Sequence, residues 1–289
     1  MIGGLDTLLE GVLLGGVYAL FAVGLSLIFG IMRLVNLAHG DIIVLAAYLI
    51  LTAMAVAGVS LGLATFLTIL VMFVAGFALQ RLVLERVLGD DILPPLLVTF
   101  GLSIVLQNGL LLVFGADSRR LQAGAFEATS IKLAPGLSVG LAPLIALVTA
   151  VVVVTLLQLL FYRTSLGRAF RATADNPEIA QLMGIDQRNI YAFAVGLSLA
   201  VSAIAAVTFG IRSNFDPSIG PARLLYAFEA VIIGGLGSLW GTLAGGLILG
   251  VAQAIGAHLD PGWQILAGHI AFLVVLAVRP QGLFPKVRT

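Results

Sequence analysis

The chain has 289 residues, of which 60% are hydrophobic and only 10% are charged, and its formal net charge is +1. A soluble domain usually carries about 25% charged residues, so this chain has too little polar surface to cover a water-soluble globule. The near-neutral charge gives no basis for nucleic-acid binding. The absence of Cys excludes disulfides, thiolate metal sites and cysteine nucleophiles. The composition therefore predicts an integral membrane protein.

Apolar runs long enough to cross a bilayer recur along the chain. A spanning helix needs roughly 20 largely apolar residues. We expect such helices at 8–30, 41–58, 61–80, 93–114, 141–161, 191–211 and 263–279, with a longer, glycine-interrupted stretch at 225–257. No basic segment precedes the first run, so we expect it to remain as a helix and not to be removed as a signal peptide. The absence of long polar linkers predicts a single transmembrane domain over 1–289, an all-α fold of about eight spanning helices plus a re-entrant or broken helix.

The stretch at 225–257 is too broken by glycine to form one helix. We expect a short half-helix, a break around 234–237 and a new helix from about Leu239. Non-helical backbone is tolerated at membrane depth only where it is buried in protein or lines a water-filled cavity. Gly234 and Gly235 are therefore candidates for the substrate path. Small residues then recur every four positions and predict close helix packing, in the series Gly237, Gly241, Gly245 and the series Gly246, Gly250, Ala254.

Lys and Arg concentrate in segments that follow alternate spans, which indicates the orientation of the chain. They cluster near 81–86, in the loop 162–190 and at 279–288. Because cytoplasmic loops carry an excess of these residues, we place the three segments in the cytoplasm, with the N-terminus outside and the C-terminus inside. This parity requires three passes, or one pass and a re-entrant pair, between 225 and 279.

The loop 162–190 is the longest polar stretch on the cytoplasmic side and contains the pattern of a short helix. Asn176 is a good N-cap, Pro177 suits the first helical position, and Gly184 suits a left-handed residue that ends a helix. Three apolar residues of this helix share one face, namely Ile179, Leu182 and Met183. This face either packs on its own bundle or in the headgroup layer, or it docks a soluble partner.

The same loop and three other segments carry motifs. The loop contains Gly167-Arg-Ala-Phe-Arg-Ala, Asp175-Asn-Pro and Ala180-Gln-Leu-Met-Gly-Ile. The other segments are Val35-Asn-Leu-Ala-His-Gly-Asp, Val231-Ile-Ile-Gly-Gly-Leu-Gly-Ser and Arg279-Pro-Gln-Gly-Leu-Phe. Together, from about Gly11 to Pro285, these motifs resemble the permease subunits of branched-chain amino acid ABC importers, and the loop resembles their cytoplasmic coupling loop.

The resemblance implies a non-enzymatic subunit of a bacterial inner-membrane importer, without a cofactor of its own. A second permease chain, more often a related one than an identical copy, would complete the translocation path. Two cytoplasmic ATPases, which bind ATP and Mg²⁺, would hold the coupling loops and displace the 177–183 helix, and a soluble binding protein would deliver substrate from outside. The sequence agrees in lacking a G-x-x-x-x-G-K-[ST] phosphate loop. The residues assigned to ATPase coupling are Gly167, Arg168, Arg171, Asp175, Asn176, Pro177, Ile179, Ala180, Leu182, Met183 and Gly184.

Polar residues near or inside the spans are further candidates for the substrate path, because ionisable groups are costly in a bilayer. Asn36, His39 and Asp41 follow the first span and predict a buried hydrogen-bonded network near the cytoplasmic end or in a re-entrant turn. This network either fixes the re-entry of the chain or gates the path. It supplies too few ligands for a metal site.

Three other polar residues have two interpretations each. Glu229 either reaches the outer interface and pairs with Arg223, which we favour, or lines the path, where a carboxylate suits the ammonium group of a zwitterion. Gln107 and Asn108 lie in the middle of the fourth span. For these two we favour hydrogen bonds across helices over a position on the path.

The predicted cargo is a branched-chain or related amino acid, with urea and short-chain amides as alternatives because sister families share the scaffold. The rival function is a stand-alone secondary transporter or channel, which can also use broken helices. Such a protein would need paired ionisable residues for a coupling ion, and it would not need an apolar cytoplasmic helix. An intramembrane hydrolase using His39 and Asp41 lacks support, since no strained nucleophile motif is present.

Overall fold

The computed structural model describes residues 2–89, 91–124, 129–134 and 137–284. The long helices are α1 (Ile2–Met32), α2 (His39–Ala57), α3 (Leu61–Leu82), α4 (Leu93–Phe114), α5 (Leu141–Arg163), α8 (Gln187–Arg212), α9 (Gly220–Gly234), α10 (Leu239–Leu259) and α11 (Gln264–Val278). The shorter elements are η1 (Leu84–Arg86), β1 (Ser130–Ala134), β2 (Leu137–Gly140), α6 (Ser165–Asp175), α7 (Pro177–Leu182) and η3 (Pro261–Trp263).

Eight helical segments of the described chain are long and apolar enough to cross a bilayer. The remaining long helix, α9, has 15 residues and rises only about 22 Å, which is less than the ~30 Å of a hydrocarbon core. It ends at Gly234, and α10 begins at Leu239. The prediction of an all-α membrane fold with one broken helix is therefore confirmed. The sequence did not predict the short antiparallel hairpin β1–β2.

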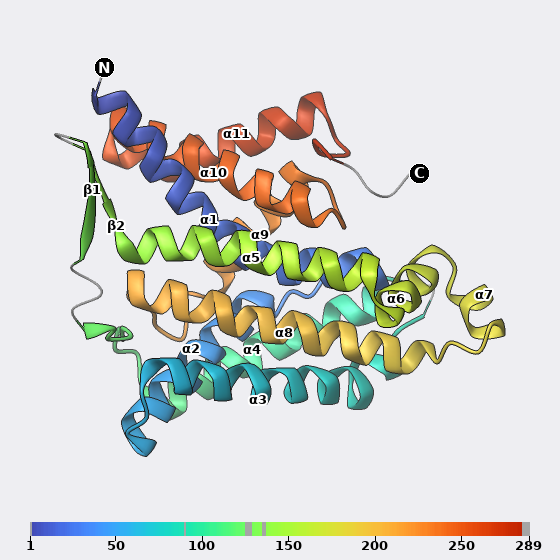
Figure 1. Ribbon diagram of the computed structural model, residues 1–289. Helices are drawn as coiled ribbons and strands as arrows, with labels where there is room; N and C mark the ends of the chain where they lie inside the picture. The colour runs from blue at the N-terminus through green and yellow to red at the C-terminus, as the bar shows by residue number, and fades with distance from the viewer. Residues whose placement is uncertain (1, 90, 125–128, 135–136, 285–289) are drawn as a thin grey trace.

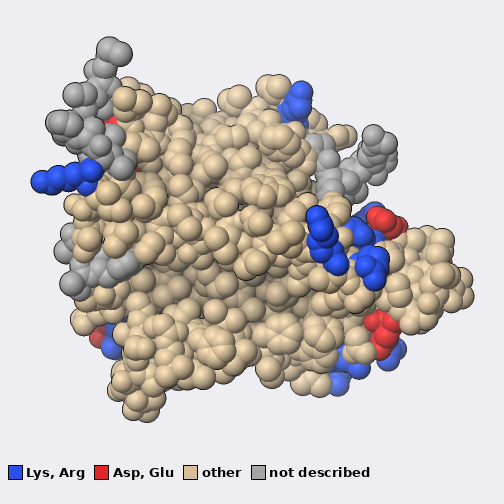
Figure 2. Space-filling model, in the orientation of Figure 1, with Lys and Arg blue, Asp and Glu red and all other residues tan. Residues whose placement is uncertain are grey.

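The bundle has two distinct ends. The N-terminus and the hairpin lie at one end, and α6, α7 and the C-terminal segment lie at the other (Figure 1). Most visible Lys, Arg, Asp and Glu side chains gather at these ends, with an almost uncharged belt between them (Figure 2). Exposed side chains of the membrane helices include Phe66, Leu112 and Leu156, as contact with lipid requires. The protein is a multi-pass membrane protein, and the end with α6 and α7 is the predicted cytoplasmic side.

Two parts of the chain have the same order of elements and opposite directions. In the first, α1 is followed by the non-helical segment 33–38 and α2; in the second, α8 is followed by the non-helical segment 213–219 and α9. Helix α1 runs toward the cytoplasmic end and α8 runs away from it (Figure 1). Helix α1 packs along α10, and α8 packs along α3 in the corresponding way. Such inverted repeats place binding sites between half-helices in many transporters.

Glycine allows α10 to pack at backbone contact distance against two neighbours. A Cβ atom on Gly245 would lie 2.7 Å from the backbone nitrogen of Gly234 in α9. A Cβ atom on Gly246 would lie 2.6 Å from the backbone nitrogen of Ala19 in α1. Gly241 and Gly245 thus face α9, whereas Gly246 and Gly250 face α1, which confirms the prediction of close packing.

Replacing Gly246 by Ala is expected to destabilise the protein by about 1–3 kcal/mol, because the added methyl group overpacks the contact with α1. The matched control is Gly109→Ala in α4, where no heavy atom lies within 4 Å of the Cβ position. This control should be neutral or slightly stabilising, since Ala favours helix over Gly. Unfolding midpoints in detergent measure both effects. Equal midpoints for the two variants would contradict the packing described here.

Candidate functional site

The cytoplasmic loop folds into two short helices with side-chain caps. The Thr164 hydroxyl accepts a hydrogen bond from the Gly167 amide at 3.0 Å and begins α6. The Asn176 carboxamide oxygen accepts one from the Ile179 amide at 3.0 Å and begins α7. Gly184, with φ of 83°, follows the end of α7 in the left-handed region. The sequence analysis identified α7 from its caps but did not predict that 165–175 is also helical.

The apolar face of α7 is uncovered. The exposed fractions are 58% for Ile179, 87% for Leu182 and 79% for Met183, whereas Ala180 on the opposite side is buried. Helix α7 also projects from the bundle (Figure 1). These three side chains do not pack on their own bundle, which leaves the lipid headgroups or a partner protein to cover them.

Helix α6 attaches α7 to the membrane bundle. A Cβ atom on Gly167 would lie 2.6 Å from the carbonyl carbon of Phe161 at the end of α5, so only glycine fits there. The buried Phe170 ring stacks on Phe161 with 5.3 Å between centroids. Arg171 Nη1 donates a hydrogen bond to the Phe161 carbonyl at 2.8 Å, while Arg168 is exposed. Gly167 and Arg171 therefore anchor α6 to the end of α5.

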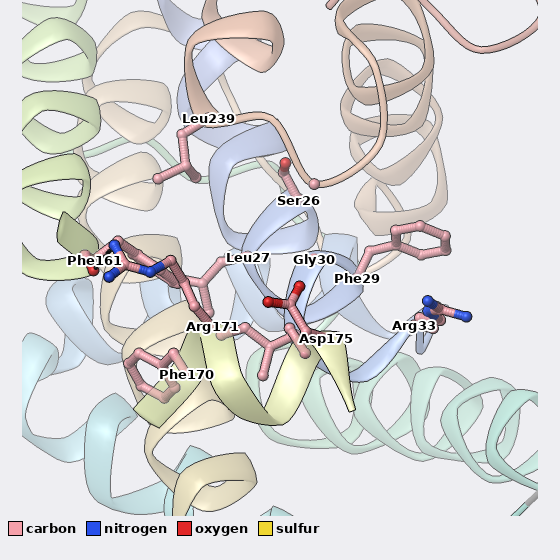
Figure 3. Close-up of a pocket in the computed structure, with 13 residues that line it drawn as sticks. Ser26, Leu27, Phe29, Gly30, Arg33, Phe161, Phe170, Arg171, Asp175 and Leu239 are labelled. Atoms are coloured by element: carbon pink, nitrogen blue, oxygen red, sulfur yellow. Dashed lines mark hydrogen bonds between the residues drawn. The ribbon is translucent and has the colours of Figure 1, made fainter. Parts of the chain in front are cut away.

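A pocket of about 400 Å³ lies where α6 meets the end of α1 and the break between α9 and α10. Its wall includes Ser26 and Gly30 of α1, Arg171 and Asp175 of α6, and Gly237 of the break. In Figure 3 the Asp175 carboxylate points from α6 toward α1. Because α6 forms one wall, a movement of the α6–α7 pair would change the shape of this inner pocket.

The C-terminal segment covers the break between α9 and α10. The backbone amides of Leu283 and Phe284 donate hydrogen bonds to carbonyl oxygens at the end of α9 at 2.9 and 3.0 Å. Gly235 and Gly237 have positive φ values of 103° and 77°, which make the turn possible. Gly234 and Gly235, predicted for the substrate path, are thus held against the tail and do not line the inner pocket. Gly237 lines it instead.

The segment 33–38 carries the chain back into the bundle before α2 begins. Asn36 Oδ1 accepts a hydrogen bond from the Ala38 amide at 3.0 Å, and His39 Nε2 bonds to the Phe21 carbonyl at 2.8 Å. Phe21 precedes the end of α1 at Met32 by 11 residues, or about 16 Å, which is half of a ~30 Å hydrocarbon core. Helix α2 therefore begins near the middle of the bilayer, as the re-entrant interpretation predicts.

Asp41 lies where the starts of two helices meet. Its carboxylate accepts a hydrogen bond from Ser103 of α4 at 2.5 Å, and Gln107 donates to the same Ser103 oxygen at 3.0 Å. A Cβ atom on Gly220, the first residue of α9, would lie 2.7 Å from Asp41 Cγ. The N-terminal ends of α2 and α9 thus approach a buried carboxylate, and their partial positive charges stabilise it. Asn36, His39 and Asp41 are all buried, but each has separate partners and they form no single network.

The favoured hydrogen bonds across helices are present for Gln107 and absent for Asn108. Gln107 bonds to Ser103 of its own helix, and Asn108 donates to the Ile104 carbonyl of its own helix at 2.8 Å. Polar side chains on a helix often satisfy themselves four residues back. Gln107 also donates to the Asp41 carboxylate of α2, whereas Asn108 is exposed and takes no part in the site.

The favoured pairing of Glu229 with Arg223 was wrong. Glu229 is only 2% exposed and forms a short bond with His269 of α11. Arg223 instead lies over the Phe209 ring, 4.4 Å from its centroid. Positions 223 and 229 differ by about 120° around a helix with 3.6 residues per turn, so their side chains leave α9 in different directions.

Ser103 and His269 were missed by the sequence analysis, although each has a signal. Thr99, Ser103 and Gln107 recur every four residues and form a polar stripe on an apolar helix. His269 interrupts the final apolar run with an ionisable group, which is a candidate by default in a membrane. Within the described ranges, no three His, Cys, Asp or Glu residues gather as a metal site would require.

Replacing His269 by Ala is expected to destabilise the protein by about 1–3 kcal/mol, because Glu229 would keep a buried carboxylate without its donor. Adding Glu229→Gln should recover part of the loss, since an amide is less costly to bury than a carboxylate. The matched control is His258→Ala, which removes an exposed His. Unfolding midpoints in detergent report the effects, and equal midpoints for the His258 and His269 variants would disprove the pairing.

Comparisons with known proteins agree over nearly the whole chain. The sequence profile of a family described as branched-chain amino acid transport system, permease component, matches residues 7–278. The chain is 32% identical to the high-affinity branched-chain amino acid transport permease protein BraD of Pseudomonas aeruginosa, over 98% of this chain and 96% of that protein. It is 31% identical to LivH of Escherichia coli K12, over 98% and 96%, and 26% identical to LivM of the same strain, over 94% and 68%. The chain belongs to the permease family of branched-chain amino acid transport systems.

Proposed function

We propose that this protein is the translocation subunit of an ATP-driven importer for branched-chain or related amino acids in a bacterial inner membrane. Membership of the permease family supports the transport role. The single structural observation that carries the ATP-driven part is the exposed apolar face of α7, anchored through α6 to the inner pocket. A gradient-driven carrier has no use for such a face at its cytoplasmic end.

The α6–α7 pair supplies a lever for partner ATPases. Leu182 and Met183 insert into a cleft of an ATPase subunit, and closure of the ATPase pair around ATP displaces α7. Because Gly167 and Arg171 tie α6 to the end of α5, the displacement reaches the inner pocket. ATP thereby shifts the permease between two conformations, since it favours the one that fits the closed ATPases.

The remaining partners follow from the same proposal. LivH and LivM of one E. coli strain are both similar to this chain, which supports a related second permease chain over an identical copy. A soluble binding protein delivers the amino acid to the end of the bundle that carries the hairpin and the N-terminus. Urea and short-chain amides are the competing cargoes.

The importer function can be tested with the purified complex in proteoliposomes. ATP and Mg²⁺ on the ATPase side should drive uptake of leucine, isoleucine and valine when the binding protein is present. Dissipating the proton and sodium gradients should leave this uptake unchanged. Uptake by this chain alone, driven by an ion gradient, would instead establish the secondary transporter. If urea or acetamide is taken up and leucine does not compete with it, the cargo is a short amide and not a branched-chain amino acid.

Replacing Leu182 and Met183 together by Asp should abolish co-purification of the ATPases. In the proposed complex these two side chains are buried against the ATPase, and the change would place two charges in that interface. The expected loss is at least about tenfold, since anchor residues of interfaces contribute 2 kcal/mol or more. The variant should still insert into the membrane and keep its unfolding midpoint, because both side chains are exposed. The matched control is Gln181→Asp, which adds charge to the same helix without removing an apolar side chain. Full ATPase recovery with the double variant would refute the docking role of α7.

A further inference from the structure

A second pocket, on the outer side of the bundle, is lined by two arginines that form no close ion pair with a described carboxylate. It has a volume of about 310 Å³, within the lower range of small-molecule sites. It lies between the first half of α1, the end of α8, the start of α11 and parts of α9 and α10. Its polar wall contains Tyr18, Arg212, Arg223, Tyr226 and Gln253. None of these residues was singled out as a site by the sequence analysis.

The two arginines interact with acidic groups only at longer range, Arg212 with Glu10 and Arg223 with Asp216. Arg212 Nη1 and Arg223 Nε are buried and have no hydrogen-bond partner in the described part of the chain. Neither arginine forms an ion pair with a described carboxylate. The Arg223 guanidinium is held over the Phe209 ring at 4.4 Å, which fixes its position but leaves its edge free to donate. Because a buried charge without a partner is costly, this arrangement is suited to an anion that arrives from outside.

A neutral donor lies in the same pocket. Tyr18 donates a hydrogen bond to Gln253 Oε1 at 2.6 Å, which fixes the orientation of that carboxamide. Gln253 is 1% exposed, and its Nε2 atom has no partner among the described residues. A carboxylate accepts hydrogen bonds from two or more donors, and the planar fork of Arg matches its geometry. The two guanidinium groups therefore line a pocket for one small anion, and the oriented Gln253 amide lies buried in its wall.

The rest of the wall suits an apolar side chain. Leu14, Val17 and Phe21 of α1 and Ile265 of α11 line the pocket beside the polar groups. An adjoining outer pocket of about 600 Å³ shares Arg212 with it and extends to Asp6 and Glu10. These carboxylates line the adjoining pocket and are suited to an ammonium group. Acidic groups in the adjoining pocket, two arginines and an apolar wall match a zwitterion with an aliphatic tail.

We propose that this outer pocket is the first binding site of the permease for its amino acid, with Arg223 and Arg212 holding the α-carboxylate and the α1 wall holding the aliphatic side chain. This inference rests on the proposed function, because that function supplies the amino acid as cargo. A lipid headgroup carries an anionic phosphate that the same arginines would accept. The apolar wall of this small pocket, however, favours a small molecule with a short branched tail.

The absence of Cys from the natural chain allows a direct test in membrane vesicles that contain the full chain and its transport partners. A single Ile265→Cys variant places a thiol in the pocket, and Val56→Cys places one at an exposed outer position. An anionic methanethiosulfonate reagent is added from outside. Millimolar L-leucine should slow labelling of Ile265→Cys and not of Val56→Cys. Leucinol, which lacks the carboxylate, should give no protection.

Adding Arg223→Gln to the Ile265→Cys variant should raise the leucine concentration for half-protection by about tenfold or more, as expected when a charged hydrogen-bond donor is lost. The matched control is Lys132→Gln, which removes one outer positive charge from the hairpin that does not line the pocket. It should leave protection unchanged. Equal protection by leucinol, or unchanged protection after Arg223→Gln, overturns the proposal. Labelling that responds to phosphatidylglycerol content and not to leucine also overturns it and assigns the arginines to lipid.

A separate measurement tests the proposed importer function. It is ATP-driven leucine uptake by the same vesicles before any labelling. If uptake occurs but leucine does not protect the thiol, the importer function stands and the outer pocket is not a binding site for the amino acid. Leucine protection without ATP-driven uptake supports the pocket and overturns the importer.

Discussion

Backbone groups inside a bilayer must find their partners within the protein, and this constraint shapes the centre of the molecule. Helices α2 and α9 both begin inside the bundle, where the chain before them has no helical hydrogen bonds. Their starts meet at Gly40 and Gly220, and a Cβ atom on Gly40 would lie 2.8 Å from the carbonyl carbon of Gly220. The closeness of the two backbones excludes lipid from the non-helical segments. Glycine contacts along α1, α9 and α10 complete the enclosure.

The two buried carboxylates in the membrane region, Asp41 and Glu229, each have a partner close by. Asp41 is stabilised by Ser103 and by two helix N-termini, and Glu229 by His269, so each buried carboxylate has a local partner. The outer pocket with its two arginines and the inner pocket beside α6 share no lining residue. The centre of the bundle separates the two pockets. In the function proposed above, transport from one side to the other requires a movement of the helices, with α6 and α7 as the proposed attachment point.

Features encoded by adjacent residues were predictable from the sequence. The break after Gly234, the start of α10 at Leu239 and the caps of α7 at Asn176 and Gly184 are all visible in short motifs. The spans were predictable to within several residues because length and hydropathy determine them. Contacts between distant helices were not predictable, as Glu229 and His269 show, since a helix that is apolar on every side does not reveal its rotation. For the same reason, the sequence could not show that Arg212 and Arg223 form no close ion pair within the described chain, because this depends on how their helices are rotated.

The most direct test of the central claim measures whether ATP moves α7 relative to the bundle. Spin labels at Glu178→Cys in α7 and Trp240→Cys at the start of α10 use two exposed positions in a chain that has no Cys of its own. Pulsed electron paramagnetic resonance then gives the distance between them in the assembled transporter, without nucleotide and with a non-hydrolysable ATP analogue. A distance distribution that shifts when the analogue binds is the predicted result. Identical distributions in the two states, in a complex that still takes up leucine with ATP, would contradict the coupling role of α7.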